Sequence, residues 1–248
     1  MFHNFIFLPL YNGLIGIMDL IPGIDVGLAV IIFTVIIRLI LFPLSKSSVL
    51  TQVRMKEVEP EANNIRAEYA TDKQTQALKI MELYKQKKVK PFSGVLLLII
   101  QLPILLALIS VFYAIIPAIH PEYLYSFVHL PILIPTLLGL DLTSKSLVLA
   151  IITAIIQFLQ MHFSIASKQA KSVNSSTPKK AGAIDGAHMA NAMTTQMKYF
   201  LPVIAFASVY WLIPAKYPQA AAVIAIYWSV SSLFTLFQEI YIRKRHIK

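Results

Sequence analysis

An arginine interrupts the first long apolar run of this chain, and its position restricts how the chain can fold. The run extends from Ile24 to Leu44, and Arg38 lies inside it. About 20 apolar residues cross the roughly 30 Å of bilayer hydrocarbon as one helix, so this run is predicted to span a membrane. An arginine near the centre of such a span costs about 2.5–3.5 kcal/mol on insertion scales. The rest of the fold must therefore accommodate this charge.

Two explanations of Arg38 follow from the sequence, and both remain open at this point. Counted back from Lys46 at about 1.5 Å per residue, Arg38 lies on the order of 12 Å inside the lysine-rich end of the span. From this depth a long side chain can reach the headgroups while its stem stays in the hydrocarbon. Alternatively the charge is kept in the membrane for a function, which is the default interpretation of an intramembrane ion.

The composition identifies the class of protein. Of the 248 residues, 57% are hydrophobic and only 14% are charged, whereas an average soluble chain carries about 25% charged residues. The chain is therefore predicted to be a polytopic membrane protein. The absence of cysteine excludes disulfides, thiolate metal sites and a cysteine nucleophile. The net charge of +10 does not by itself indicate a specific nucleic-acid partner, because the position of the charges matters more than their sum.

The predicted fold class is all-α: five transmembrane helices plus a cytoplasmic helical hairpin. Residues 1–23 lack the basic start of a secretory signal, and their aromatic and polar residues favour an outer segment that lies in the membrane interface. The remaining expected parts are the first span (24–45), the charged hairpin (46–90), four further spans within 91–242 (about 92–116, 144–163, 199–214 and 218–242), the polar loop 164–198 and the basic tail 243–248.

The distribution of lysine and arginine predicts the orientation. Segments 45–90, 164–198 and 243–248 are basic, whereas the N-terminus and 117–143 contain no lysine or arginine. Basic loops stay in the cytoplasm, and five alternating spans place all three basic segments on that side. We therefore expect the N-terminus outside and the C-terminus in the cytoplasm.

Sparse polar side chains recur at similar depth in several of the expected spans. In the third span, positions 153, 157, 160 and 164 share one helical face. Interhelical hydrogen bonds, each worth about 0.6 kcal/mol, explain any single one of them. A water-filled pocket that keeps Arg38 hydrated explains them together, since the only nearby acid is Glu239, at the membrane boundary. The candidate pocket residues are Thr34, Arg38, Gln101, Gln157, Gln160, Trp228, Ser231, Ser232 and Thr235.

The chain lacks the motifs of enzymes and of cofactor sites. It contains no phosphate-binding G-x-x-x-x-G-K-[ST] loop, no H-E-x-x-H and no G-x-S-x-G. We therefore predict that it is not an enzyme and that it binds no cofactor or metal. A small-solute permease or channel for anions is the alternative function, because a polar pocket with an arginine suits an anion. Against this alternative, the outer halves of the spans offer almost no polar path across the membrane.

Several segments together resemble the YidC/Oxa/Alb membrane-protein insertase family, in its short bacterial YidC-type form. They are the arginine span that ends in Phe42-Pro43-Leu44, the charged hairpin, the stretch Pro91–Pro103, the Phe158-Leu-Gln160 motif and the Tyr227-Trp228 pair. The resemblance covers about residues 24 to 242 in unbroken order.

The resemblance implies an insertase and chaperone for small membrane proteins in the bacterial inner (plasma) membrane. It implies a hydrophilic groove, open to the cytoplasm and to lipid, in which Arg38 engages the incoming chain. Gln160 or Gln157 would be the polar contact of the third span, and Trp228 the aromatic one of the fifth. The implied partners are nascent membrane-protein clients, ribosome–nascent chain complexes, the Sec translocon and the lipid bilayer.

Overall fold

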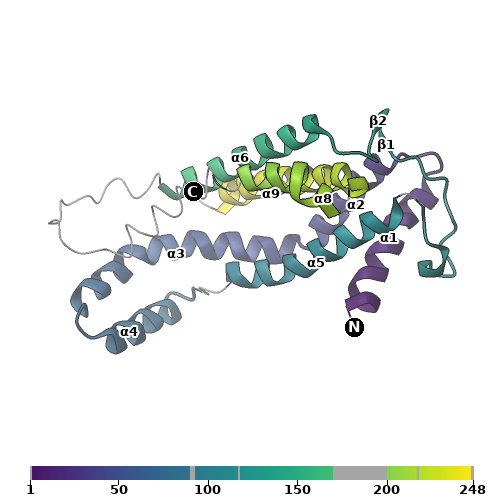
Figure 1. Cartoon of the computed structure of the whole chain (residues 1–248). Helices are drawn as coiled ribbons and strands as arrows, with labels where there is room; N and C mark the ends of the chain where they lie inside the picture. The colour runs from purple at the N-terminus through teal and green to yellow at the C-terminus, as the bar shows by residue number, and fades with distance from the viewer. Residues whose placement is uncertain are drawn as a thin grey trace. The chain divides into compact units, whose positions relative to one another are not determined.

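The computed structural model describes residues 2–89, 93–116, 118–169, 200, 202–216 and 218–246 of the chain. These residues are mostly helical (Figure 1). In order, the elements are η1 (His3–Phe7), α1 (Leu8–Leu20), α2 (Val26–Ile40), α3 (Phe42–Glu68), α4 (Lys73–Gln86), α5 (Ser93–Ile115), η2 (Pro121–Tyr123), β1 (Thr136–Leu137), β2 (Leu140–Asp141), α6 (Leu147–Gln169), η4 (Ser208–Leu212), α8 (Ile213–Lys216), η5 (Pro218–Ala220) and α9 (Ala221–His246).

Two of the described helices are long and apolar enough to cross a membrane. These segments are Leu147–Ser164 within α6 and Ala221–Arg245 within α9. A third candidate exists if α2 and Phe42–Met55 form one broken span, and Pro103–Ile115 and Pro202–Lys216 are shorter apolar helices. The count of five spans therefore stays a prediction. Most of the expected loop 164–198 lies outside the described residues.

The chain divides into two compact units, Met1–Leu39 with Pro103–Phe237 (unit 1) and Ile40–Leu102 with Gln238–Lys248 (unit 2). One apolar cluster fills unit 1, with residues from α1, α2, α5 and α9. The N-terminal helix α1 contributes a stripe at i, i+3, i+4 and i+7, which is the spacing of one helical face. Its members Tyr11, Leu14, Ile15 and Met18 are almost fully buried. The segment expected at the membrane interface is therefore a helix with one face in the core of unit 1.

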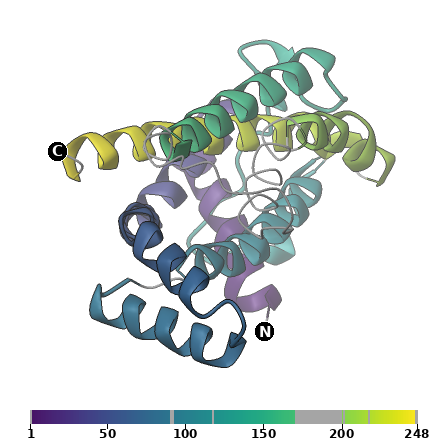
Figure 2. The same cartoon turned by 90° about the vertical axis from the view of Figure 1, so that its left-hand side faces the viewer.

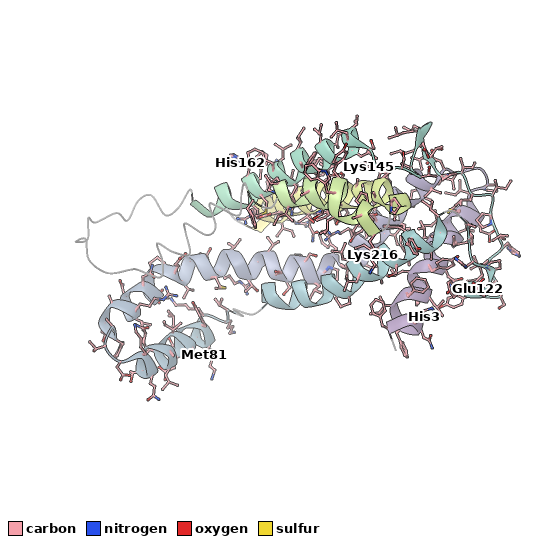
Figure 3. The ribbon with its side chains drawn as sticks, in the orientation of Figure 1. His3, Met81, Glu122, Lys145, His162 and Lys216 are labelled. Carbon is pink, nitrogen blue, oxygen red and sulfur yellow. The ribbon has the colours of Figure 1, made fainter. Side chains whose placement is uncertain are left out.

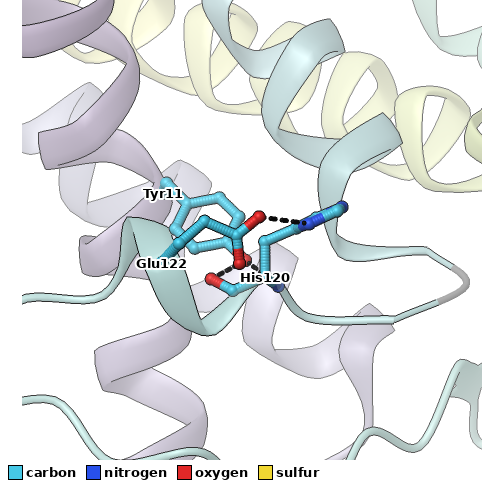
Figure 4. A network of polar contacts seen from close by, with 3 residues as sticks. All are labelled: Tyr11, His120 and Glu122. Carbon is cyan, nitrogen blue, oxygen red and sulfur yellow. Dashed lines mark hydrogen bonds and ion pairs between the residues drawn. The ribbon is translucent and has the colours of Figure 1, made fainter.

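Side chains of α1 also fix the segment that follows α5. The buried amide of Asn12 donates from Nδ2 to the carbonyl oxygen of Tyr123 at 2.8 Å and accepts at Oδ1 from the backbone N–H of Tyr125 at 2.7 Å. The Tyr11 hydroxyl accepts from the backbone N–H of His120 at 2.7 Å, and the His120 ring lies 2.9 Å from the Glu122 carboxylate (Figure 4). These bonds hold residues 120–125 against α1.

Unit 2 contains a pair of charged helices, α3 and α4, which lie side by side (Figures 1 and 2). A small apolar cluster of Val58, Ala62, Leu83 and Val89 joins them. Asp72 caps α4, because its Oδ1 accepts the backbone N–H groups of Gln74 and Thr75, both at 3.1 Å. The turn between the two helices is thus closed by specific hydrogen bonds.

Several element boundaries differ from those expected. The helix breaks at Leu41, before the end of the expected first span, because Pro43 lacks the N–H that a continuous helix needs there. Pro60, which the sequence allows either to begin or to kink the first hairpin helix, lies inside α3. Helix α6 continues to Gln169, beyond the expected end at 163. The pattern of the sequence also does not predict the two short strands, in which Thr136 pairs with Asp141 and Leu137 with Leu140.

Candidate functional site

The guanidinium of Arg38 contacts a hydroxyl group of another helix of unit 1. Arg38 lies in the last turn of α2, is partly buried, and donates from Nη2 to Oγ of Ser231 on α9. Ser231 itself is only 4% exposed. The structure thus brings together two of the candidate pocket residues that lie 193 positions apart in the sequence.

Two other candidate hydroxyls are satisfied within their own helices. Thr34, which precedes Arg38 by about one turn and is 1% exposed, donates to the carbonyl oxygen of Val30 at 2.6 Å. Thr235 donates to the carbonyl oxygen of Ser231 at 2.9 Å. Both hydroxyls are therefore paired within their own helices, α2 and α9, and leave no unpaired donor in an apolar setting.

A second polar contact joins α6 to α9. The Ser232 hydroxyl donates to Oε1 of Gln157 at 2.9 Å, and both side chains are buried. One turn earlier on α6, the Thr153 hydroxyl lies 2.9 Å from Oγ of Ser229 and 3.2 Å from the carbonyl oxygen of Ala225. We call these four side chains, Thr153, Gln157, Ser229 and Ser232, the α6–α9 seam.

Two members of the seam, Thr153 and Ser229, are not among the candidate pocket residues, although Thr153 belongs to the polar face of the third span. A signal for both is present in the sequence, since Ser229 and Ser232 lie at i and i+3 on α9, and Thr153 and Gln157 lie at i and i+4 on α6. Residues at these spacings share a helical face, so two polar pairs on two helices can face each other in register.

The remaining candidates have different surroundings. Trp228 is partly buried and packs against the apolar cluster of unit 1, and Gln160 is partly buried one turn after Gln157 on α6. Gln101 lies in α5, and its side chain is outside the described residues. Glu239, the acid considered as a partner for Arg38, accepts hydrogen bonds from Arg243 at 3.0 and 2.6 Å.

The arrangement offers polar contacts and no catalytic constellation. Among the residues that the structure describes, no group of three or more histidine and acidic side chains could hold a metal ion. Lys145 precedes α6, and His162 lies within it (Figure 3). Among the described residues, the hydrogen bonds of Ser231 and Ser232 go to Arg38 and Gln157 and not to Lys145 or His162, so they pair neither serine with a base.

The chain has clear relatives. Residues 17–248 match the family described as 60Kd inner membrane protein. The membrane protein insertase YidC of Fusobacterium nucleatum is 31% identical over 220 residues, which are 88% of this chain and 86% of that protein. The membrane protein insertase YidC 1 of Lactococcus lactis is 28% identical over 86% of this chain and 66% of its own length. The membrane protein insertase YidC of Francisella philomiragia is 27% identical over 89% of this chain and 32% of its own length. The chain thus spans about a third of the length of the last relative and most of the first.

Proposed function

Since the chain belongs to the 60Kd inner membrane protein (YidC/Oxa) family, we propose that it is a membrane protein insertase. It binds hydrophilic parts of incoming membrane proteins, brings them into the bilayer and releases their apolar segments sideways into lipid. It works by binding, and its site needs no catalytic group.

The observation that carries the mechanism is the contact between Arg38 and Ser231. A guanidinium keeps its charge in all ordinary conditions, and a single neutral hydroxyl does not compensate that charge in an apolar setting. Water and polar groups of a client supply the remaining hydrogen bonds, so the surroundings of Arg38 form a hydrophilic groove. The proposed groove is lined by Thr34, Arg38, Gln157, Gln160, Trp228, Ser231, Ser232 and Thr235, and Gln101 stays a candidate from the sequence.

The α6–α9 seam also supports this proposal, because its polar groups are already paired with each other. The hydroxyl of Ser232 and the amide of Gln157 bond to each other, so these two side chains are less available to a client than Arg38 is. In the proposed groove they form a fixed wall, and the arginine is the group that attracts the client.

The proposed orientation follows the basic residues, with five spans, the N-terminus outside and the C-terminus in the cytoplasm. In this orientation the charged hairpin 46–90, which contains α4 and most of α3, lies in the cytoplasm, where ribosomes present nascent membrane proteins. Ribosome–nascent chain complexes and the Sec translocon are the proposed partners.

Reconstitution separates the insertase from the permease. The purified protein in vesicles is given a small single-span client, and in parallel an anionic solute. We expect protease-protected client in the protein-containing vesicles only, and equal solute flux with and without the protein. Solute flux without client insertion would establish the permease instead.

A further inference from the structure

The β1–β2 hairpin carries an apolar residue at a position that turn geometry assigns to other residue types. Its two central residues, Leu138 and Gly139, have φ of 50° and 87°. Two-residue hairpin turns with positive φ at both positions favour asparagine or glycine, because the Cβ atom of other residues lies too close to the following carbonyl oxygen in this region. The Leu138 side chain is 82% exposed, so contacts within the protein do not offset the cost of this close approach.

The hairpin is bound closely to the first turn of α2. Asp25 accepts the backbone N–H of Leu28 at 2.7 Å with one carboxylate oxygen and the backbone N–H of Leu138 at 2.9 Å with the other. The N–H of Val26 donates to the carbonyl oxygen of Ile134 at 2.9 Å. A Cβ atom on Gly27 would lie 2.5 Å from Cβ of Leu137, so this approach requires glycine. These contacts therefore fix the position of Leu138 beside the first turn of α2.

That position is level with the start of a candidate membrane span. Helix α2 begins at Val26 and forms a candidate span together with Phe42–Met55. The candidate span Leu147–Ser164 begins six residues after the hairpin ends at Asp141. The first turns of spanning helices lie where hydrocarbon meets headgroups. A side chain fixed at this level has lipid within reach.

The hairpin and the start of α6 both carry exposed apolar side chains. Ile132 is 81% exposed and Leu140 41% exposed, and at the start of α6 Leu147 and Val148 are 49% and 62% exposed. Residues 117–143 contain no lysine or arginine. Exposed apolar side chains thus lie both on the hairpin and at the start of a candidate span, and Lys145 lies between the two in the sequence.

We propose that the β1–β2 hairpin inserts its tip into the bilayer interface. Leu138 is the leading side chain and Ile132 and Leu140 support it, so the hairpin anchors this end of unit 1 to lipid. Burial of a leucine side chain in hydrocarbon offsets the backbone cost of its left-handed conformation. The occupant of this surface is lipid, because the hydrogen bonds of Asp25 and the close contact at Gly27 hold it at the level of the spans. The proposal requires only a membrane-embedded chain and does not depend on insertase activity.

Depth measurements by spin labelling test the proposal, and the chain contains no cysteine that would interfere. A nitroxide is attached to Leu138→Cys in protein reconstituted in phosphatidylethanolamine–phosphatidylglycerol vesicles. Its collision rates with oxygen, which concentrates in hydrocarbon, and with a water-soluble nickel chelate are compared. Val148→Cys on α6 is the lipid-exposed control, and Glu122→Cys is the water-exposed control.

We expect the label at 138 to resemble the label at 148, with high oxygen and low nickel accessibility. Nickel accessibility equal to that at position 122 would overturn the proposal, because the tip would then lie in water. Protection from both reagents with spin–spin broadening would also overturn it, since a second copy of the chain would then cover the surface.

A second variant separates the side chain from the turn. Asparagine tolerates positive φ, so Leu138→Asn keeps or improves the turn while it removes the apolar group. With the label at Leu140→Cys, we expect Leu138→Asn to raise nickel accessibility severalfold and Leu138→Trp to restore the original depth. The thermal stability of both variants in detergent should remain at least that of the parent. An unchanged depth at position 140 in the asparagine variant would contradict lipid anchoring.

Discussion

Arg38 of α2 donates a hydrogen bond to the Ser231 hydroxyl of α9, although 193 positions separate the two residues in the sequence. The contact directs the guanidinium toward another helix of unit 1. It therefore favours an arginine that is positioned within the protein over one that snorkels to the headgroups. If the arginine snorkelled, Ser231 would have no effect on its position.

The first prediction uses this difference. Ser231→Ala removes the acceptor, and a hydrogen bond to a charged group is worth about 1.5–3 kcal/mol. We expect client insertion to fall severalfold while the protein remains abundant, because Arg38 keeps its charge but loses its position. Ser110→Ala is the matched control, since the Ser110 hydroxyl donates only to Leu106 of its own helix, at 3.1 Å. Equal activity of the two variants would support the snorkelling explanation.

The second prediction concerns the α6–α9 seam. Interhelical hydrogen bonds in membranes contribute about 0.6 kcal/mol on average and about 1.7 kcal/mol at most. We expect Ser232→Ala to lower the free energy of unfolding by an amount in this range, because it leaves Oε1 of Gln157 without its donor. Unfolding in detergent mixtures measures the change. A double-mutant cycle with Gln157→Leu should give a coupling energy of the same size, and additive effects would show that the contact is not formed.

The third prediction concerns Asn12. Its Nδ2 donates to the carbonyl oxygens of Leu8 and Tyr123 at 2.9 and 2.8 Å, and its Oδ1 accepts from Tyr125 at 2.7 Å. Asn12→Leu leaves the groups of Tyr123 and Tyr125 unpaired, at a cost of about 1–3 kcal/mol for each buried group. We expect limited proteolysis to cut near residues 120–125 in this variant and not in the parent.

The replacement Asn12→Asp provides a sharper comparison. A carboxylate still accepts the N–H of Tyr125, but it has no proton to donate to the two carbonyl oxygens. We expect this variant to be cut at least as fast as Asn12→Leu at neutral pH. Asn4→Asp, at an exposed position of η1, is the control. Resistance of Asn12→Asp to protease would show that the amide does not donate to these carbonyls.

The fourth prediction concerns pH at the turn between α3 and α4. Hydrogen bonds from the Thr75 side chain and backbone, and from the Gln74 N–H, lower the pKa of Asp72 below its ordinary value. Because the pKa is lowered, the stabilisation by this cap is fully present at pH values above the ordinary pKa of aspartate. It is lost as the pH falls through the pKa of Asp72 in the folded protein. We expect hydrogen-exchange protection of the Thr75 amide to follow this course. Asp72→Asn should keep protection at all pH values, because it still accepts, and a pH-dependent loss in this variant would contradict the assignment.

The features that could be predicted from the sequence are those that depend on local pattern and on composition. Apolar runs and charge identify a membrane protein, and the polar face that includes Gln157 was visible from its spacing alone. Ser231 and Ser232 were candidates because they interrupt an apolar helix. Their separate partners, Arg38 and Gln157, depend on how three helices pack, and no local pattern specifies that packing.

The contacts around α1 could not be predicted for the same reason. Asn12 bonds to Tyr123 across 111 residues, and Asp25 to Leu138 across 113 residues. A lone asparagine in an apolar helix and an aspartate before a span are visible signals that a partner exists. They do not identify the partner, because a closed loop of this length has many possible contacts. The two-residue strands are also too short for an alternating pattern to indicate them.

In the proposed mechanism, Arg38 attracts hydrophilic client segments by its positive charge. At an effective dielectric constant near 20, opposite charges about 4 Å apart attract by roughly 4 kcal/mol. The direct measurement is insertion of one client, in its acidic form and with its acidic residues neutralised, by Arg38→Lys and Arg38→Ala proteins of known abundance. We predict that Arg38→Lys retains much of the parent's activity, and that Arg38→Ala loses at least tenfold with the acidic client and far less with the neutralised one. An abundant Arg38→Ala protein that inserts the acidic client as well as the parent does would contradict the claim.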